Sequence, residues 1–287
     1  MKHICQSKEW AQFKESYGNK AVPAGGVTFF KTKIPLIPYF AGYCPKADLT
    51  KVDFSKVAAT AKSENCVFVK FDPINLIPPY PSLPPYPLKK TQGVFAKETI
   101  ILDLIPPLED LKAGLKSKTR YNVGLARRKG VKVREGGEAD LEIFLKLQKE
   151  TAKRQGFFVH PDEYFRKMWA VLYPAGMLKL LVAEVEGQPV AVWIFFVYNK
   201  VFYYPYGASS YKYRDYMPSD LLMWEAIKLA QKLECGEFDM WGATSNQTDP
   251  WWGFTRFKLG FGGKMVEFAE SYDLVVNKPL YYAFQAA

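Results

Sequence analysis

The sequence has few residues suited to binding a metal ion or forming disulfides. It contains four cysteines, at Cys5, Cys44, Cys66 and Cys235, and no two of them form a C-x-x-C pair. A structural zinc site needs about four converging cysteine or histidine ligands, and only two histidines are present. We therefore expect no metal ion, no disulfide framework and no cofactor.

Long apolar runs are also missing. The longest, Pro189 to Tyr198, is far shorter than the roughly 20 residues that a membrane-spanning helix needs. The segment Met1 to Trp10 is polar and lacks the apolar core of a signal peptide. These absences predict a cytoplasmic protein without a transmembrane segment.

No nucleophile and base stand out as a catalytic set. His3 and His160 are the only imidazoles, and neither has a recognisable Ser-His-Asp or Cys-His partner. A transferase of this composition would bring an amine and an activated acyl group together and stabilise the developing oxyanion. Asp239 and Asp249 are candidates for the general base by position only, so the base is left unassigned.

What the sequence does contain is ample core material and a basic segment. The chain has 287 residues, of which 48% are apolar, enough for two domains of ordinary size. Its net charge is +10. Eight cations and no acid lie between residues 116 and 134. Such a concentration suits phosphate recognition, and a solvated helix face explains it equally well. The cations are Lys116, Lys118, Arg120, Arg127, Arg128, Lys129, Lys132 and Arg134.

Hydrophobic periodicity and turn residues predict a series of helices and strands in each half. In the first half we expect a helix after Ser7, strands at Val27–Lys33, Ile37–Phe40, Cys66–Phe71 and Thr99–Leu104, a helix at Asp48–Asn65, and an extended proline-rich loop at Pro73–Pro87. In the second half we expect helices at Ala139–Gln155, Pro161–Tyr173 and Ser219–Leu233, and strands at Met177–Glu186, Pro189–Tyr198, Val201–Tyr206 and Glu237–Trp241.

The two halves repeat one order of elements: helix, strands, helix, strand. An antiparallel meander followed by a helix and a further strand is the layout of an N-acetyltransferase-like (GNAT-like) fold. The predicted class is thus α/β (α+β), with two such domains in tandem and a cleft between them. We expect the first domain at residues 1–105, with residues 270–287 packing back on it, and the second at residues 106–269.

One loop argues against coenzyme A. Acetyltransferases of this layout hold the coenzyme A pyrophosphate on a glycine-rich loop before the central helix, because free backbone N–H groups at a helix start bind phosphate. Here that loop is Ser209 to Pro218, which has no glycine and is crowded with tyrosine. A coenzyme A site is disfavoured, although Lys212 and Arg214 keep it open.

A set of short motifs, in order along nearly the whole chain, resembles the FemABX family of peptidoglycan bridge-forming aminoacyltransferases. Each motif is weak alone, and their order and spacing carry the resemblance. They are Gln6-Ser7-x-x-Trp10 with Phe13-Lys14, Phe71-Asp72-Pro73, Leu102-Asp103-Leu104, Lys116-Ser117-Lys118-Thr119-Arg120, Ala126-Arg127-Arg128-Lys129-Gly130-Val131, Gly156-Phe157, Pro161-x-x-Tyr164-Phe165, Tyr204-Pro205-Tyr206-Gly207-Ala208-Ser209, Phe238-Asp239-x-x-Gly242 and Phe257-Lys258-x-x-Phe261-Gly262-Gly263.

The resemblance implies a reaction and two partners. The donor would be an aminoacyl-tRNA, and the acceptor would be the stem-peptide amine of a peptidoglycan precursor, either lipid II or UDP-MurNAc-pentapeptide. A lipid-linked acceptor would bring the enzyme to the inner face of the membrane. The chain lacks the long coiled-coil insertion of larger members, so any contact of the basic segment with tRNA would come from the globular body.

The resemblance also implies roles for individual residues. Lys258 matches a cleft lysine that would steady the ester carbonyl or the adjacent tRNA phosphate. The expected substrate-binding residues are Lys14, His160, Tyr164, Tyr204 and Tyr206, and the expected tRNA-binding residues are Lys116, Lys118, Arg120, Arg127, Arg128 and Lys129.

One of these positions departs from the family pattern. His160 stands where nucleotide-using members have an arginine, and a neutral imidazole grips phosphate less well than a bidentate guanidinium. Trp241 and the pair Trp251-Trp252 add aromatic surface on which bases or a sugar would stack, and buried packing explains them equally well.

Two other functions fit the same sequence. An acyl-coenzyme A N-acyltransferase of the GNAT superfamily would be protected by coenzyme A against thermal unfolding. A noncatalytic RNA- or glycan-binding module would keep every activity and binding constant when Lys258 is replaced, since fold alone does not establish activity.

Overall fold

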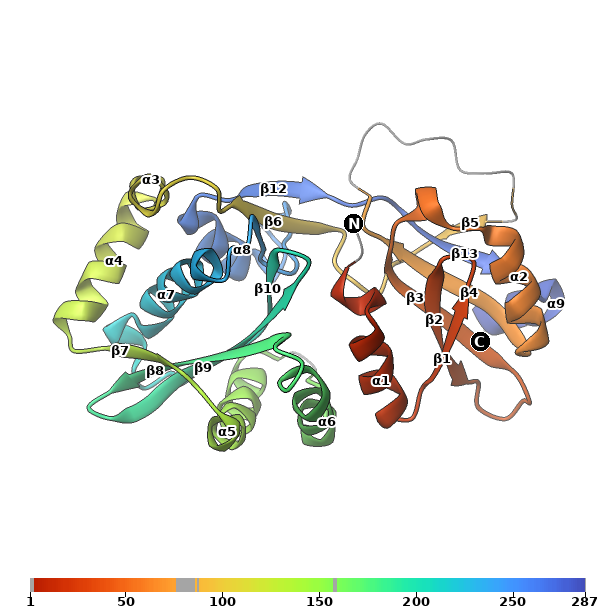
Figure 1. Ribbon diagram of the computed structural model, residues 1–287, viewed down its shortest axis with the longest axis horizontal. Helices are drawn as coiled ribbons and strands as arrows, with labels where there is room; N and C mark the ends of the chain where they lie inside the picture. The colour runs from red at the N-terminus through yellow and green to blue at the C-terminus, as the bar shows by residue number, and fades with distance from the viewer. Residues whose placement is uncertain (1–2, 76–85, 87, 157–158, 287) are drawn as a thin grey trace. The chain divides into compact units, whose positions relative to one another are not determined.

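The computed structural model describes residues 3–75, 86, 88–156 and 159–286. The chain divides into two compact units, Met1–Glu98 with Val266–Ala287, and Thr99–Met265 (Figure 1). Each unit is built on its own mixed sheet. Much of the proline-rich segment predicted at Pro73–Pro87, and Phe157 of the Gly156-Phe157 motif, lie outside the described residues.

The first unit is a six-stranded sheet with helices packed on it, in the strand order β1-β2-β3-β4-β13-β5. Its elements are η1 (Ile4–Gln6), α1 (Lys8–Ser16), β1 (Lys20–Ala24), β2 (Val27–Lys33), β3 (Phe40–Ala47), η2 (Leu49–Lys51), α2 (Phe54–Ser63), β4 (Cys66–Pro73), β5 (Leu88–Thr91), β13 (Ser271–Val275) and α9 (Lys278–Gln285).

Side-chain caps fix where the helices of this unit begin. The Ser7 hydroxyl accepts from the backbone N–H of Trp10 at the start of α1, and the Asp53 carboxylate accepts from Lys56 at the start of α2. Such caps satisfy N–H groups that have no partner within the helix. The C-terminal strand β13 lies between β4 and β5, antiparallel to both, so residues at the end of the chain complete the first sheet.

The second unit holds a seven-stranded sheet in the order β12-β6-β11-β10-β9-β8-β7. Its elements are β6 (Glu98–Asp103), α3 (Leu108–Ala113), α4 (Ser117–Arg128), β7 (Lys132–Glu135), α5 (Glu138–Gln155), α6 (Asp162–Leu172), β8 (Leu178–Val185), β9 (Gln188–Tyr198), β10 (Val201–Ser209), η3 (Arg214–Tyr216), α7 (Pro218–Lys232), β11 (Glu237–Asp239), α8 (Trp252–Lys258), η4 (Leu259–Phe261) and β12 (Lys264–Glu267).

Helices cover both faces of the second sheet. Helix α7 packs on β8 and β9 and is flanked by α4, while α5 packs on β9 and β10 from the other side (Figure 1). The α7 side holds the main core, to which β9 and β10 contribute Trp193, Phe195 and Phe202. Strands buried on both faces are consistent with the near-continuous apolar run of β9.

A bulge in β10 decides which way its tyrosines point. Tyr203 pairs with Phe196 and Tyr206 with Ile194, so β10 has one residue more than β9 in this interval. Side chains alternate along a strand, and one extra residue reverses that alternation. Tyr204 therefore packs against the α7-side core, while Tyr206 contacts Phe165 of α6 on the opposite face.

The predicted α/β class with two GNAT-like domains is confirmed. The strand Val27–Lys33 forms with the predicted bounds, and the helix after Ser7 and the helices and meander of the second half also form, the latter with shifted ends. The strand predicted at Ile37–Phe40 is wrong: residues 34–39 form a turn, closed by a hydrogen bond from Ile34 N to Tyr39 O, and β3 begins only at Phe40. The helix predicted at Asp48–Asn65 is shortened, because Asp48 caps the separate turn η2.

The observed units divide at Glu98 and Val266, a few residues before the expected divisions at 105 and 269. The difference arises because β6 pairs with β11 inside the second sheet. Within the described part of the chain, the longest helix is α5 with 18 residues, so these residues hold no coiled-coil arm. None of the described helices combines the length and apolarity needed to cross a bilayer.

Candidate active site

Lys258 is the last residue of α8, and its amine is buried. The side chain is 8% exposed, and Nζ donates a 2.7 Å hydrogen bond to the carbonyl oxygen of Gly242. Burial lowers the pKa of Lys258 from 10.5 to about 8, with a smaller opposing effect from the carboxylate of Asp239. A buried amine with a lowered pKa is a frequent mark of a functional site.

The turn after β11 supplies the carbonyl that holds Lys258. Trp241 and Gly242 have φ angles of 55° and 95°, both in the left-handed region that glycine adopts without strain. Asp239 Oδ1 accepts hydrogen bonds from Trp241 N and from Thr99 Oγ1, at 2.8 and 2.5 Å. This carboxylate therefore fixes the turn, and the turn fixes the position of the amine.

Tyr204 lies beside Lys258 in the same unit. The lysine Nζ is 5.7 Å from the centroid of the tyrosine ring, which stacks on Trp193 at 4.4 Å. A Cβ atom at Gly207 would overlap the Tyr204 hydroxyl oxygen, so this glycine leaves the space that the ring occupies. Burial holds the pKa of Tyr204 well above its usual value, so the phenol stays protonated and available as a hydrogen-bond donor.

The sheet opens beside this group. Strands β10 and β11 run parallel and pair only from Val201 to Tyr203 and from Glu237 to Asp239. Beyond that point β10 continues to Ser209, while β11 ends and the chain turns away at Trp241. After the last pair, β10 remains paired with β9 but no longer with β11. The edge of β10 that faces away from β9 could there hydrogen-bond to a planar acyl group, next to Tyr204 and Lys258.

His160, Tyr164 and Tyr206 form a second group on the other face of the sheet. The imidazole of His160 stacks on Tyr164 at 3.9 Å, and the Tyr164 and Tyr206 hydroxyl oxygens are 3.4 Å apart. Phe165 supports Tyr206 from α6 at 5.0 Å. His160 is exposed and Tyr164 is buried, which suits an aromatic platform with a polar rim.

Of the six residues expected to contact substrates, the second unit thus groups Lys258 with Tyr204, and His160 with Tyr164 and Tyr206. Lys14 lies on α1 of the first unit, and its Nζ is 5.6 Å from the ring centroid of Tyr17, the C-cap residue of that helix. The sequence interpretation gave no site role to the neighbours Trp193, Gly207, Gly242 and Thr99. Gly207 and Gly242 appeared in it only as parts of motifs, and no signal in the sequence pointed to Trp193 or Thr99.

The six residues expected to contact tRNA are all exposed, along and at both ends of α4. Three of them also serve the fold. Arg120 donates to the carbonyl oxygens of Ala113 and Leu115, Arg127 pairs with Glu225 at 2.9 Å, and Lys129 donates to the Asp215 carbonyl. Arg128 lies over the ring of Tyr121 at 5.6 Å, Lys116 is the N-cap residue of α4, and Lys118 lies in its first turn.

The start of α7 is poorly suited to phosphate. Its first turn carries the carboxylate of Asp220, bonded to Asn122 Nδ2 at 3.2 Å. Tyr213, Tyr216 and Met217 of the preceding loop pack against the core. An acid in the first turn takes the place where a pyrophosphate would benefit from the helix dipole.

Neither of the two candidates for the general base, Asp239 and Asp249, forms an ion pair with Lys258. Asp249 Oδ1 accepts from Trp251 N at 2.7 Å and shapes the turn before α8, while Asp239 holds the Trp241 turn. Trp241 packs edge-on against Tyr203, and Trp251 is half exposed. Across the described ranges no three His, Cys, Asp or Glu side chains gather as metal ligands, and the four cysteines are buried and form no disulfide.

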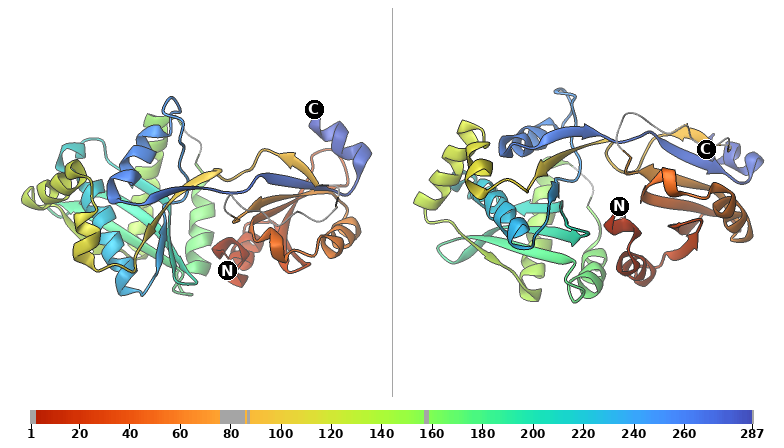
Figure 2. Two further views of the ribbon diagram at one scale, coloured as in Figure 1. Left: turned by 90° about the horizontal axis from the view of Figure 1, so that it is seen from above. Right: turned by 45° about the horizontal axis from the view of Figure 1, so that its top comes forward.

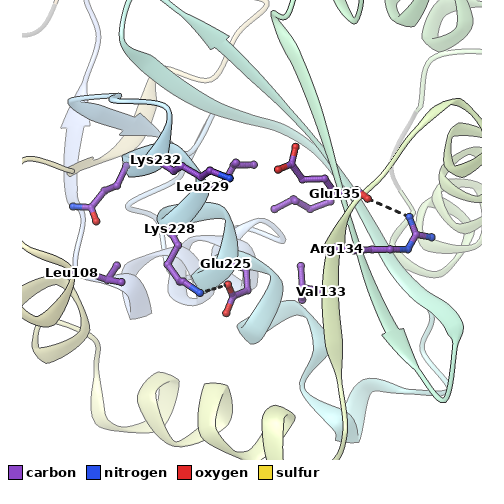
Figure 3. A pocket seen from close by; sticks show the side chains of 10 residues that line it. Leu108, Val133, Arg134, Glu135, Glu225, Lys228, Leu229 and Lys232 are labelled. Carbon is purple, nitrogen blue, oxygen red and sulfur yellow. Dashed lines mark hydrogen bonds and ion pairs between the residues drawn. The ribbon is translucent and has the colours of Figure 1, made fainter.

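A separate open groove of about 640 Å³ lies between α7 and the edge strand β7 (Figure 3). Leu108, Val133, Leu181 and Leu229 form its apolar part, and Lys228 on its wall pairs with Glu225 at 2.6 Å. None of the expected site residues lines this groove.

Comparisons with known proteins found relatives of this chain. A family model described as "Acetyltransferase (GNAT) domain" covers residues 117–258, and thus ends on Lys258. Lipid II:glycine glycyltransferase of Staphylococcus epidermidis is 23% identical over 374 positions, covering 97% of this chain and 89% of the relative. That alignment has more positions than this chain has residues, so the relative carries insertions that this chain lacks.

Two further proteins extend the comparison. UDP-N-acetylmuramoylpentapeptide-lysine N(6)-alanyltransferase of Weissella viridescens is 31% identical over 134 residues, covering 46% of this chain and 39% of the relative. A crystal structure of FemX superposes with a TM-score of 0.84 at 19% identity and covers 98% of this chain and 94% of that one. From these similarities taken together, the chain is an aminoacyltransferase that belongs to the FemABX family of peptidoglycan bridge-forming enzymes.

Proposed function

We propose that the protein transfers an amino acid from aminoacyl-tRNA to the stem-peptide amine of a peptidoglycan precursor. The observation that carries the proposal is the buried amine of Lys258, which is bound by the Gly242 carbonyl and lies beside Tyr204 at the point where β10 and β11 separate. The proposal also rests on the relatives, whose names describe transfer of glycine to lipid II and of alanine to the lysine of UDP-N-acetylmuramoylpentapeptide.

The reaction is the aminolysis of an ester. The acceptor nitrogen forms a bond to the ester carbonyl carbon, and the bond from that carbon to the ribose oxygen of tRNA breaks. The proton lost by the amine goes to the departing ribose oxygen, by way of solvent or a substrate group. No other reactant is required, because an ester is a more reactive acyl donor than the amide formed.

Lys258 suits the role of electrophile in this reaction. With a pKa of about 8, the amine is mostly protonated at pH 7 and presents N–H donors besides the one bound to Gly242. A positioned cation in a dry environment stabilises the negative oxygen that develops on the carbonyl, and the loss of one such donor costs about 10²–10³ in rate in known enzymes. Tyr204, whose ring centroid lies 5.7 Å from this amine, stays protonated and would offer a second donor.

The basic face of α4 supports tRNA as the donor carrier. Lys116, Lys118 and Arg128 are exposed, and none of them is in an ion pair within the described ranges. Cations without an acidic partner are free to contact phosphates. Acyl-coenzyme A is the weaker candidate, because Asp220 and the packed tyrosines lie where its pyrophosphate would bind.

The test is to incubate the protein with a charged tRNA pool and each precursor, and to determine product mass. We expect the acceptor to gain the mass of one or more amino acid residues, dependent on charged tRNA. Transfer from acyl-coenzyme A with no transfer from aminoacyl-tRNA would contradict the proposal, and so would the absence of any product from either donor.

A further inference from the structure

A turn in the first unit exposes a large apolar side chain at a cost in backbone energy. Leu36 lies between Pro35 and Pro38 at the tip of the β2–β3 connection, is fully exposed, and has a φ of 67°. A residue with a side chain rarely adopts this left-handed conformation, which glycine adopts easily. Neither burial nor backbone preference explains a leucine here, which makes a functional explanation worth testing.

The C-terminal helix exposes two more apolar side chains. In α9, Leu280 and Tyr281 face the sheet, while Tyr282 and Phe284 are 52% and 43% exposed. Figure 2 shows α9 on the opposite face of the first sheet from α2. Only Tyr281 of this helix is buried, so most of its surface remains available.

The turn and the helix lie side by side. Ile34, Ile37 and Tyr39 of the turn belong to the same apolar cluster as Leu280 and Tyr281 of α9. The exposed residues Leu36, Tyr282 and Phe284 therefore flank one cluster at one end of the sheet, and we call them, with that cluster's rim, the apolar end of the first unit.

The exposed charged residues of the turn and of α9 are lysines, and the nearby Asp273, which accepts a hydrogen bond from Tyr281, is buried. Lys33, Lys89 and Lys278 are exposed, and the Nζ of Lys89 lies 4.1 Å from the Tyr282 ring centroid. Neither residues 33–39 nor residues 278–286 include an aspartate or a glutamate. Exposed leucine and aromatic rings next to lysines, without acids, are typical of surfaces that dock on anionic lipid.

The geometry points to the apolar end of the first unit as a membrane-docking surface that binds a bilayer containing anionic headgroups. Leu36, Tyr282 and Phe284 enter the interfacial layer, while Lys33, Lys89 and Lys278 stay at the headgroups. This inference concerns binding and does not need the transfer reaction. Its consequence, that the acceptor is the lipid-linked precursor, rests on the proposed function.

The experiment is sedimentation of the full chain with vesicles of phosphatidylcholine, with and without phosphatidylglycerol. We expect binding to the mixed vesicles and little to phosphatidylcholine alone. Leu36→Ser should weaken binding about tenfold, since the leucine leaves water on docking, and Lys89→Glu should weaken it at least about fivefold. Val94→Ser and Lys8→Glu change exposed residues elsewhere in the same unit and should leave binding unchanged.

A second pair of variants separates this surface from the basic face of α4. The double variant Leu36→Ser with Tyr282→Ser should lose vesicle binding while keeping the wild-type melting temperature. If that double variant binds as the wild type does, and reversal of Lys116, Lys118 and Arg128 to Glu abolishes binding, the inference is wrong. Equal binding to both vesicle types, or binding of RNA instead of vesicles at this end, would also overturn it.

The consequence for the acceptor has its own readout. The wild type should use the precursor in vesicles at a higher rate than the nucleotide-linked form, and Leu36→Ser should lose that advantage while keeping its rate on the soluble form. Vesicle binding without any transfer would leave the surface standing and contradict the proposed function. Transfer without vesicle binding would support the proposed function and contradict the docking surface.

Discussion

The Nζ of Lys258 donates a 2.7 Å hydrogen bond to the carbonyl oxygen of Gly242, sixteen residues earlier in the chain. That bond joins the end of α8 to the turn that follows β11, where the sheet opens beside Tyr204. The lysine is thereby held in a site that disfavours its charge. Such an arrangement is unfavourable for stability and useful for catalysis.

Replacing Lys258 by methionine should stabilise the protein. Burial moves the lysine pKa from 10.5 to about 8, which corresponds to roughly 3 kcal/mol against the charged form. Loss of the bond to Gly242 offsets part of this, so the free energy of unfolding at pH 7 should rise by about 1–2 kcal/mol, as urea denaturation would measure.

The pH dependence of this effect follows from the same shift. Between about pH 8 and 10.5 the unfolded chain keeps the Lys258 proton that the folded chain has lost, so wild-type stability rises with pH in this window. The difference in the free energy of unfolding between Lys258→Met and the wild type should therefore be smaller at pH 9.5 than at pH 7. A methionine variant that is less stable at pH 7, or a difference that grows with pH, would contradict the burial of a charged lysine.

Lys258 should also shape the pH–rate profile. Below pH 8 the rate should rise as the acceptor amine loses its proton. Above about pH 8 it should level off, because Lys258 then loses the proton that its role requires. In Lys258→Arg the charge persists to high pH, so a lower rate should go on rising between pH 8 and 10. If the rate levels off at the same pH in both enzymes, the loss of the Lys258 proton is not the cause of the levelling.

Gly207→Ala should damage the Tyr204 site, because the new Cβ would overlap the tyrosine hydroxyl. Forcing the ring off Trp193 should cost about 1–3 kcal/mol of stability and reduce transfer by at least about tenfold. The matched control is Gly236→Ala, which has nothing within 4 Å of its Cβ and should behave as the wild type. Thermal melts and transfer rates that are alike for the two alanine variants would show that the space beside Tyr204 is not needed.

The basic face of α4 should account for much of the salt dependence of tRNA binding. Reversing Lys116, Lys118 and Arg128 to Glu should lower affinity and reduce the slope of log K against log salt by roughly 2–3, if each cation contacts one phosphate. Arg120→Met is the control, because Arg120 binds two backbone carbonyls and should affect stability more than the slope. An unchanged slope in the triple variant would exclude this face.

The residues that the sequence placed well are those governed by local rules. Ser7 starts α1 through its own hydroxyl, and the hairpin residues of the β8–β9–β10 meander fix their turns within a few residues. The end of the chain was harder to place, because β13 gains its partners from β4 and β5, about 200 residues earlier. Residues 270–287 carry no local signal that would identify these two strands as partners.

The site residues also differ in whether local sequence or distant partners determine their positions. The sequence pattern Tyr204-Pro205-Tyr206 treats both tyrosines as equivalent, and the extra residue in β10 sends them to opposite faces. Propensity does not encode a bulge that is set by pairing with β9. The burial of Lys258 could not be predicted from the sequence either, because it depends on the carbonyl of Gly242 and on the stacking of Tyr204 on Trp193.

The most direct measurement is single-turnover transfer by Lys258→Met, with aminoacyl-tRNA binding measured on the same preparation. If Lys258 stabilises the ester carbonyl in the transition state, the rate constant for transfer should fall by about 10²–10³, while the Kd for aminoacyl-tRNA changes by less than about threefold. A wild-type rate constant, or a loss of binding that equals the loss of rate, would contradict this role.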